Sequence, residues 1–477
     1  MNSLEDKYEV VIGLEVHVQL NTQSKAFCGD PNLFGTAPNN NISIISLAYP
    51  GTLPKANKTH IRSAIKMGLA INSEINHQIY FDRKNYFYPD LPKGYQITQD
   101  NQPICLGGEF ILKLVKGERH IRIHHIHMEE DAGKSIHDLS DKYTLLDYNR
   151  AGVPLLEMVT EPDLRSGEET LQFIEEVQRL VRYLEISDGR MEEGSLRADC
   201  NISVRPKGQE AYNNRVEIKN VNSKKFAKKA IEFETVRQIK IMEEGGTVKQ
   251  ETRGFDVQKG ITIPQREKEN VHDYRYFPEP DLCPMEIDEA YLNGIKAEMP
   301  LLPEAMKAKL IETYKLSDYD ADILSREKED AEYFMHLAEE VENEDLSKLV
   351  INKILPWKGE SNTIGDFPIS SKNIIALLAL IKSGKISAAA AYSKLFPLML
   401  NSDGKPAAIA EKAGLLIAGD LDLEALLAEA IKKHPKKYEE LLKGKKQFIN
   451  LFMGEIIRSS KGKADPEKAK NLILQKL

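Results

Sequence analysis

Residues Arg197-Ala-Asp-Cys-Asn-Ile-Ser-Val-Arg205 decide the fold of the first part of this chain, because polar and apolar side chains alternate along them without a break. In an extended strand, successive side chains point to opposite faces of a sheet. One face would carry Arg197, Asp199, Asn201, Ser203 and Arg205, and the other Ala198, Cys200, Ile202 and Val204. A few residues later Arg215-Val-Glu-Ile-Lys219 repeats the pattern, with Arg215, Glu217 and Lys219 on its polar side. We therefore predict two strands of one sheet with an apolar core face and a polar face.

The polar face of this predicted sheet has a distinctive composition. Solvent-facing strands usually mix Thr, Lys and Glu, whereas here Arg, Asp, Asn, Glu and Lys stand together. Such a set suits a site that holds phosphates, a metal ion and carboxylates at once. The alternative is an exposed sheet face crossed by ion pairs with no further role, and the pattern leaves both interpretations open.

Length and charge bound the class of protein. A chain of 477 residues exceeds one hydrophobic core, so about two to four domains are expected. Its 65 Lys and Arg against 73 Asp and Glu give a net charge of −8, which argues against nucleic-acid binding by the whole surface. From Ile431 to Leu477, however, 13 basic and 5 acidic residues give +8. A local basic patch is therefore predicted at the C-terminal end.

Cysteine usage and the N-terminal segment indicate a cellular location. Cys28, Cys105, Cys200 and Cys283 are widely spaced and form no C-x-x-C pair, which fits a reducing compartment. The first residues lack the basic and apolar regions of a signal peptide, and no apolar run is long enough to span a bilayer. We expect a soluble cytoplasmic protein without a membrane partner.

Composition changes along the chain predict three domains. Up to about Leu282, alternating segments, two amphipathic helices and many Gly, Pro and Asn turns indicate an α+β domain. The first helix should run from a capping box, Ser166-x-x-Glu169, to a stop at Asp188-Gly189. The second should run from about Lys224 to Gly245-Gly246, with an apolar stripe of Phe226, Ala230, Phe233 and Val236. Beyond a boundary near residue 295 the chain should be helical, with a loop at 359–368 and a linker at 401–406 before a third unit.

Two segments carry candidate metal ligands. Glu15, His17 and Gln19 should share one strand face, where a carboxylate and an imidazole can bind one ion, although a half-buried strand often carries such a polar edge without a ligand. His124-His-Ile-His-Met-Glu-Glu-Asp131 adds three histidines and three acids. Alternation sends His124 and Glu130 to one side, and His125, His127 and Glu129 to the other. Consecutive carboxylates favour Mg²⁺ or Mn²⁺ over zinc, and the alternative is a solvated acidic turn.

Other segments narrow the chemistry. Ala132-Gly-Lys-Ser135 is not a P-loop, because Met128 stands where the first glycine is needed and acidic residues precede it. The stretch from Phe81 to Tyr95 interleaves cations with aromatic residues, as surfaces for nucleotides and RNA ends do, although a packed loop is an equal alternative. The stretch from Asp147 to Asp163 contains Gly152-Val-Pro154, which is typical of a loop with a defined conformation and not of a solvent-exposed spacer.

Seven segments in order carry a family resemblance. They are GLEVHVQL (13–20), DRKNYFYPDLPKGYQITQ (82–99), HMEEDAGKS (127–135), DYNRAGVPLLEMVTEPD (147–163), GRMEEGSLRADCNISVRP (189–206), EIKNVNS (217–223) and ENVHDYRYFPEPDL (269–282). Several long motifs in one order are far more specific than any single motif. Over nearly its whole length, the chain resembles the GatB/GatE family, the B subunits of tRNA-dependent aspartyl/glutamyl amidotransferases.

The resemblance implies a fold and a reaction. The fold would be a mixed α/β, cradle-like catalytic domain (1–294), an all-α helical domain (295–404) and a small helical YqeY-like tail (405–477) that binds tRNA. ATP would phosphorylate the side-chain carboxylate of mischarged Asp-tRNA(Asn), Glu-tRNA(Gln) or both, and ammonia would then displace phosphate to give the amide. Acyl-phosphate formation agrees with elementary chemistry, because a carboxylate offers ammonia no adequate leaving group. The partners would be the glutaminase subunit GatA and the small subunit GatC in a heterotrimer.

The resemblance also implies site residues. The implied metal ligands for Mg²⁺, or Mn²⁺, are Glu15, His17, Glu130 and Glu217, with Glu129 as an outer or alternate ligand. Lys84, Arg197 and Lys219 would contact phosphates, and Asp199 and Ser195 would line the same cleft. Glu157 is assigned to the loop scaffold, where its loss would act through stability.

One departure from the family concerns zinc. Many members carry four cysteines with zinc spacing around the early loop, whereas this chain has Cys28 alone there. We therefore expect no zinc and a loop held by packing and hydrogen bonds.

A non-catalytic scaffold that binds tRNA is the alternative class of function. The acidic residues Glu15, Glu129, Glu130 and Glu217 argue against it, because a surface that only binds RNA would avoid them near phosphates.

Overall fold

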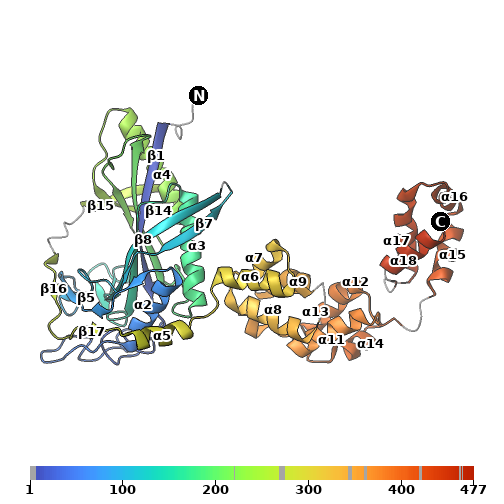
Figure 1. Ribbon diagram of the computed structural model, residues 1–477, viewed down its shortest axis with the longest axis horizontal. Coiled ribbons are helices and arrows are strands. Elements are labelled where there is room, and N and C mark those ends of the chain that lie inside the picture. The colour runs from blue at the N-terminus through green and yellow to red at the C-terminus, as the bar shows by residue number, and fades with distance from the viewer. Residues whose placement is uncertain are drawn as a thin grey trace. The chain divides into compact units, whose positions relative to one another are not determined.

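The computed structural model describes residues 7–115, 117–219, 221–267, 274–341, 346–358, 363–417, 422–460, 464 and 466–477. The chain divides into two compact units, Met1–Ala305 and Met306–Leu477 (Figure 1). The division falls after the predicted boundary near residue 295. The predicted separation of a tail at residue 405 remains a prediction.

A large sheet forms the frame of the first unit. In its described part, ten strands follow the order β15-β14-β13-β12-β1-β11-β8-β6-β2, with β7 also paired to β8. All neighbours are antiparallel except β13 and β14. The bounds are β1 Tyr8–Gln19, β2 Glu74–Ile75, β6 Cys105–Leu106, β7 Glu109–Leu114, β8 Gly117–Glu130, β11 Pro154–Thr160, β12 Leu196–Pro206, β13 Val216–Lys219, β14 Glu251–Asp256 and β15 Ile261–Glu267.

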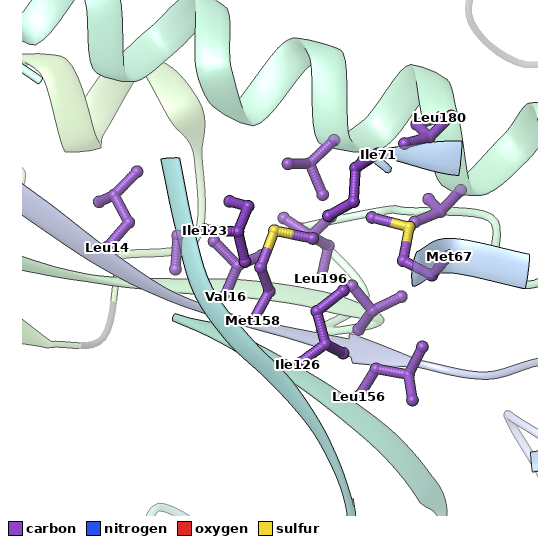
Figure 2. Packing of buried hydrophobic residues seen from close by; sticks show 14 of the residues in the cluster. Leu14, Val16, Met67, Ile71, Ile123, Ile126, Leu156, Met158, Leu180 and Leu196 are labelled. Atoms are coloured by element: carbon purple, nitrogen blue, oxygen red, sulfur yellow. The ribbon is translucent and has the colours of Figure 1, made fainter. Parts of the chain in front are cut away.

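The alternating segments form the centre of this sheet, as predicted. Strand β12 pairs with β1 on one side and with β13 on the other, where Asn201 lies opposite Glu217. Strand β13 begins at Val216, so Arg215 precedes it. Ala198, Cys200, Ile202 and Val204 are all buried. The apolar faces of the central strands pack with helices in one core, part of which Figure 2 shows.

Four helices contribute described residues to that core: α2 (Lys58–Ala70), α3 (Gly167–Tyr183), α4 (Lys224–Glu243) and α5 (Glu289–Ala297). Ser166 caps α3 as predicted, accepting a hydrogen bond from the Glu169 N–H at 3.1 Å. The Glu169 carboxylate, however, accepts from the backbone of Arg165, so the predicted capping box is not reciprocal. The predicted stripe of α4 is wrong at Val236, which is 61% exposed. The buried face is rotated and includes Glu234, which pairs with Arg237 and Arg253.

Smaller elements flank the sheet. Strands β4 (Asp82–Asn85), β5 (Tyr95–Thr98) and β16 (Phe277–Pro278) form a separate three-stranded sheet. Strands β9 (Lys134–Ile136) and β10 (Leu145–Asp147) form a hairpin, and β3 (Gln78–Ile79) pairs with β17 (Met285–Glu286). Helix α5 (Glu289–Ala297) contacts α2. Residues 269–273 of the last family segment lie outside the described residues.

The second unit is helical where it is described, as predicted. Helix α6 (Pro303–Tyr314) leads into α7 (Asp318–Leu324), α8 (Lys328–Glu340), α9 (Leu346–Leu349), α10 (Leu355–Lys358), α11 (Ser371–Lys382), α12 (Ala388–Ala390), α13 (Phe396–Met399), α14 (Pro406–Lys412), α15 (Leu423–Lys433), α16 (Pro435–Leu442), α17 (Ile449–Ser459) and α18 (Pro466–Gln475). Leu427, Phe452, Ile456 and Ile473 share a buried cluster at its C-terminal end. Residues 359–362 of the predicted loop lie outside the described residues. Together the two units give the predicted α+β class.

No helix in the described parts of the chain has the length and apolar character needed to cross a membrane.

Candidate functional site

The register of four strands builds a row of ionisable groups across the polar face of the sheet. His127 on β8 lies opposite Glu157 on β11, Glu157 lies opposite His17 on β1, and His17 lies opposite Arg197 on β12. Side chains directly opposite in antiparallel strands approach closely. Residues distant in the sequence therefore meet in one site.

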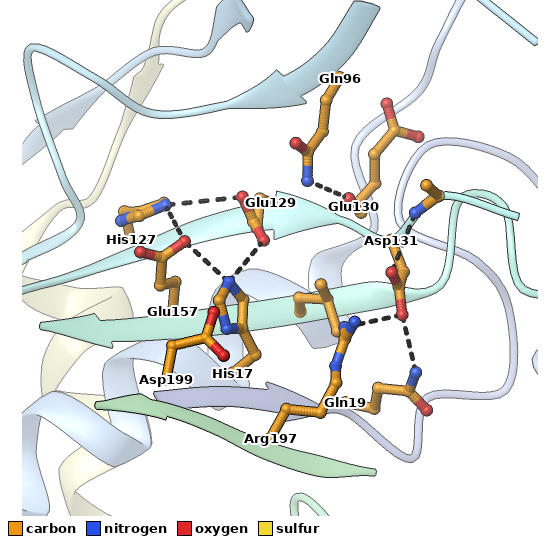
Figure 3. Close-up of polar contacts among 12 residues, drawn as sticks. His17, Gln19, Gln96, His127, Glu129, Glu130, Asp131, Glu157, Arg197 and Asp199 are labelled. Carbon is orange, nitrogen blue, oxygen red and sulfur yellow. Dashed lines mark hydrogen bonds and ion pairs between the residues drawn. The ribbon is translucent and has the colours of Figure 1, made fainter. Parts of the chain in front are cut away.

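The first candidate metal group lies on this row and consists of His17, Glu129 and Glu157. His17 Nε2 lies 3.0 Å from Glu157 Oε2 and 3.5 Å from Glu129 Oε1. His127 Nε2 contacts the same two carboxylates from the other side, at 3.4 Å and 3.7 Å (Figure 3). Two acids and one imidazole that face a common point form a donor set for a hard divalent cation.

The second candidate metal group consists of Glu15, Asp199 and Glu217, on three neighbouring strands. Glu15 lies opposite Asp199 in the register. Lys219 Nζ lies 2.8 Å from Asp199 Oδ2 and 3.3 Å from Glu217 Oε1. Three carboxylates with one ammonium leave excess negative charge in this group.

The pKa shifts show which charges dominate at each position. Burial, followed by the charges of Glu157, Glu217 and Asp199, raises the pKa of Glu15. Burial alone would lower the pKa of His127, but Glu157 and Glu129 raise it to about 10. Burial likewise opposes the charged form of Lys84, yet Glu129 and other acidic groups raise its pKa. The site therefore favours cations and holds surplus carboxylate charge.

A cavity of about 600 Å³ opens on these groups. Its lining includes His17 and Glu129 as well as the three predicted phosphate contacts Lys84, Arg197 and Lys219. Arg197 donates to Asp131 at 2.9 Å, and its buried Nε has no hydrogen-bond partner among the described residues. The cavity thus combines carboxylates with cations.

The structure does not bring Glu130 to the other predicted metal ligands. Its carboxylate pairs with Lys93 and accepts a hydrogen bond from the Ile97 N–H at 2.9 Å. The physical reason is the pleat of β8, which points Glu129 and Glu130 to opposite faces. The predicted convergence of Glu15, His17, Glu130 and Glu217 on one ion is therefore wrong in this geometry. Glu129, and not Glu130, lies in the first candidate metal group.

Ser195 also has a different role from the predicted one. Its hydroxyl binds Asp188 and accepts from the Arg190 N–H at 2.8 Å, which closes the turn before β12. It does not line the 600 Å³ cavity, whereas Asp199 does, as predicted.

Sequence reasoning missed two members of the site. Glu157, assigned to the scaffold, lies between His17 and His127. Asp131 is buried and binds Gln19 at 2.8 Å as well as Arg197, so the guanidinium groups lower its pKa although burial alone would raise it. A signal for Glu157 existed, because it is the only ionisable residue in the apolar strand β11.

The polar face is not the exposed, ion-paired surface of the alternative interpretation. Asn201, Ser203 and Glu217 are buried, although they lie on the polar side. Burying this many polar groups is costly unless they bind one another or a ligand.

Hydrogen bonds hold the early loop near Cys28, as expected. The Cys28 thiol lies 3.5 Å from the Ser46 hydroxyl. The buried Asp30 carboxylate accepts from the Ser43 N–H at 2.9 Å and from the Ser46 hydroxyl.

Comparison with known proteins gives the family. The model of the GatB/GatE catalytic domain matches residues 10–293, and that of the GatB domain matches residues 332–477. Proteins named as the B subunit of aspartyl/glutamyl-tRNA(Asn/Gln) amidotransferase are similar over almost their whole length. The protein of Prosthecochloris aestuarii is 44% identical over 98% of both chains, and that of Pelagibacter ubique is 42% identical over 99% of this chain and 97% of its own. The protein of Alkalilimnicola ehrlichii is 44% identical over 99% of both. A sheet whose polar face carries two acidic groups, with matches over both units, establishes that this chain belongs to the GatB/GatE family.

Proposed function

We propose that this chain is the subunit of a tRNA-dependent amidotransferase that activates the carboxylate of mischarged Asp-tRNA(Asn), Glu-tRNA(Gln) or both. ATP would transfer its terminal phosphoryl group to the side-chain carboxylate, giving an acyl phosphate and ADP. Ammonia would then attack the acyl carbon, releasing phosphate and leaving the amide. The single observation that carries this proposal is one cavity that brings Lys84, Arg197 and Lys219 together with members of both candidate metal groups.

The donor chemistry fits Mg²⁺, or Mn²⁺. The groups His17, Glu129, Glu157 and Glu15, Asp199, Glu217 supply mainly carboxylate oxygens, which such ions prefer. A bound ion would offset charge on the transferred phosphoryl group. The raised pKa of Glu15, due to burial and its acidic neighbours, supports a need for positive charge at this point.

The cationic residues would handle the phosphates. Arg197 is fixed by Asp131 and lines the cavity, so its guanidinium group would meet an oxygen of ATP or of the acyl phosphate. Lys219 is held between Asp199 and Glu217, and Lys84 lies over the Tyr274 ring at 5.0 Å. Prepositioned cations stabilise charge that develops in phosphoryl transfer.

We further propose that ammonia comes from a glutaminase partner, GatA, and that GatC completes a heterotrimer in the cytoplasm. The residues assigned to this site are acids, bases and cations suited to phosphoryl transfer. A separate subunit would therefore hydrolyse glutamine.

The basic tail would bind the body of the tRNA. Lys436, Lys437, Lys443, Lys445, Lys446 and Arg458 are exposed, while Lys461 and Lys463 lie outside the described residues. Lys445 and Arg458 pair with Glu440 and Glu455, so part of the positive charge is offset locally. The remaining charge supports contacts with phosphates.

Hydroxylamine trapping tests the proposal. The complex with GatA and GatC would be incubated with mischarged tRNA, ATP and hydroxylamine, which converts an acyl phosphate to a hydroxamate without glutamine. We expect ATP-dependent hydroxamate on the tRNA-linked amino acid. Glu15→Gln should lower its rate by about 100- to 1000-fold.

A matched control lies on the same strand. Glu9, also on β1, pairs with Arg205 and Arg165 away from both candidate metal groups. Glu9→Gln should leave hydroxamate formation unchanged within about twofold, because surface ion pairs contribute little. Absence of ATP-dependent hydroxamate with the wild-type complex and either mischarged tRNA would refute the proposal.

A further inference from the structure

The aromatic segment noted in the sequence forms a tip beside the site cavity. Residues 86–94 connect β4 to β5, and the Tyr86 N–H donates to the Gly94 carbonyl at 3.3 Å. Tyr86 lines the cavity that also contains His17 and Glu129. The two following rings lead outward: Tyr88 is 48% exposed and Phe87 is 79% exposed.

The rings of Tyr86, Tyr88 and Tyr274 form a contiguous aromatic group, and Phe87 follows Tyr86 in the same loop. The ring centroids of Tyr86 and Tyr88 are 5.8 Å apart, and those of Tyr86 and Tyr274 are 6.1 Å apart. A side chain at Gly94 would lie 3.2 Å from the Phe87 ring, so this ring rests directly on the glycine. Exposed aromatic surface that continues into a functional cavity is typical of a binding surface.

Hydrogen bonds hold the tip in place. The Tyr148 hydroxyl donates to the Pro89 carbonyl at 2.8 Å, and the Gly133 N–H donates to the Asp90 carbonyl at 2.8 Å. The Ser135 hydroxyl adds a bond to the Asp90 carboxylate at 3.1 Å. The rings are therefore presented by an anchored loop, which lowers the entropic cost of binding a ligand.

We propose that Phe87 and Tyr88 are a stacking platform for the unpaired 3′-terminal nucleotides of the mischarged tRNA. The inference rests on the proposed function, in which the aminoacyl group enters the cavity at His17. That group is esterified to the terminal ribose, and an aspartyl or glutamyl side chain is short. The terminal nucleotides must therefore lie at the cavity mouth, where Tyr86 leads to Tyr88 and Phe87.

Chemistry favours an RNA end over other ligands at this surface. Unpaired bases stack on aromatic side chains, and each such contact contributes substantially to affinity. The nearby cavity lining supplies the guanidinium group of Arg150 for a phosphate that accompanies the bases. The platform would position the substrate without taking part in phosphoryl transfer.

A double-mutant cycle on tRNA binding tests the platform. The assembled complex, wild type or Phe87→Ala/Tyr88→Ala, would be titrated with uncharged tRNA that is either intact or shortened by its unpaired 3′ nucleotides. Each lost stack should weaken binding by roughly 5- to 150-fold. For the wild type, shortening the tRNA should cost affinity. For the variant it should cost almost nothing, because the same contact is already missing.

Kinetics and controls complete the test. With mischarged tRNA, Phe87→Ala/Tyr88→Ala should have a higher KM and an unchanged kcat for hydroxamate formation. Phe87→Trp, which keeps an aromatic ring and leaves Tyr88 intact, should bind tRNA as the wild type does. Phe34→Ala removes a ring that is also 79% exposed but belongs to a different loop, and should not alter tRNA affinity.

Two results would overturn the inference. Additive effects of the protein and tRNA changes would show that the rings do not touch the 3′ end. Loss of a partner subunit from the Phe87→Ala/Tyr88→Ala complex would show that they dock on protein instead. Failure of the wild-type complex to form hydroxamate at all would refute the proposed function, a separate outcome from either of these.

Discussion

Replacement of Glu157 by Gln tests the geometry of the site directly. The carboxylate of Glu157 lies 3.0 Å from His17 Nε2 and 3.4 Å from His127 Nε2 on the polar face. Gln has almost the same shape and keeps one hydrogen-bond acceptor, so the change removes mainly the negative charge. The sequence alone assigned this residue to the scaffold, whereas the structure places it among the candidate metal ligands.

The expected magnitude follows from the contacts. Loss of one charged group that acts in the transition state costs about 3–4 kcal/mol, or about 100- to 1000-fold in the phosphorylation rate. The stability cost should be smaller. Both imidazoles can release their protons when their anionic partner is lost, which limits the cost to about 1–3 kcal/mol. The pKa of His127, raised to about 10 mainly by Glu157 against the effect of burial, should fall in the variant.

Hydroxamate formation by the assembled complex, measured across Mg²⁺ concentrations, checks this prediction. Glu157→Gln should lower the maximal rate and raise the Mg²⁺ requirement. Glu130→Gln is the informative comparison, since its carboxylate binds Lys93 and Ile97 on the opposite side of β8. If Glu130→Gln slowed phosphorylation by more than Glu157→Gln did, the assignment of the ligand face would be wrong.

Three further predictions concern other parts of the chain. Deleting residues 405–477 should weaken tRNA binding and reduce the slope of log Kd against log salt by about 0.7–0.9 per lost phosphate contact, and a salt titration with an unchanged slope would contradict the role of the tail. His60 is buried and donates to the Leu155 carbonyl at 2.9 Å, and burial lowers its pKa to about 4. As the pH falls, His60 is protonated in the unfolded chain before it is protonated in the folded protein. The stability that neutral, buried His60 contributes should therefore be present above about pH 6.5, and the free energy of unfolding should fall by about 2 kcal/mol between pH 7 and pH 5. In urea unfolding, the free energy of unfolding of His60→Gln should fall less than that of the wild type between pH 7 and pH 5, by this amount. An equal fall in both proteins would exclude His60 as the cause. The early loop should hold without zinc, so metal analysis of the purified protein should find no stoichiometric zinc, and chelation-resistant zinc would refute this expectation. In the same loop, Asp30→Asn weakens the hydrogen bonds to Ser43 and Ser46 and should increase proteolysis.

Local patterns predicted much of the fold. Alternation along Arg197–Arg205 identified β12 and its buried face, because a period of two leaves only one way to bury Ala198, Cys200 and Ile202. Helix capping identified the start of α3 at Ser166. The stripe of α4 was less well predicted, because burial of Glu234 depends on Arg237 and Arg253, and Arg253 comes from another element.

The composition of the site was also largely visible in the sequence. Glu15, His17, Glu129, Asp199, Glu217, Lys84, Arg197 and Lys219 were all singled out, and all lie in or beside the two candidate metal groups or the cavity. Their chemical types favour divalent cations and phosphates wherever they meet. The choice between Glu129 and Glu130, by contrast, depended on the register of β8 against β11.

The sequence by itself determined the α+β class, the polar and apolar faces of the central strands and the family, because these depend on periodicity and on motifs that are local in the chain. Only the tertiary structure decided that Glu157 stands between His17 and His127, that Glu130 turns to Lys93, and that Ser195 closes a turn. The physical reason is that neighbours across an antiparallel sheet are set by strand order and register. Those depend on the packing of the whole core, and no single segment encodes them.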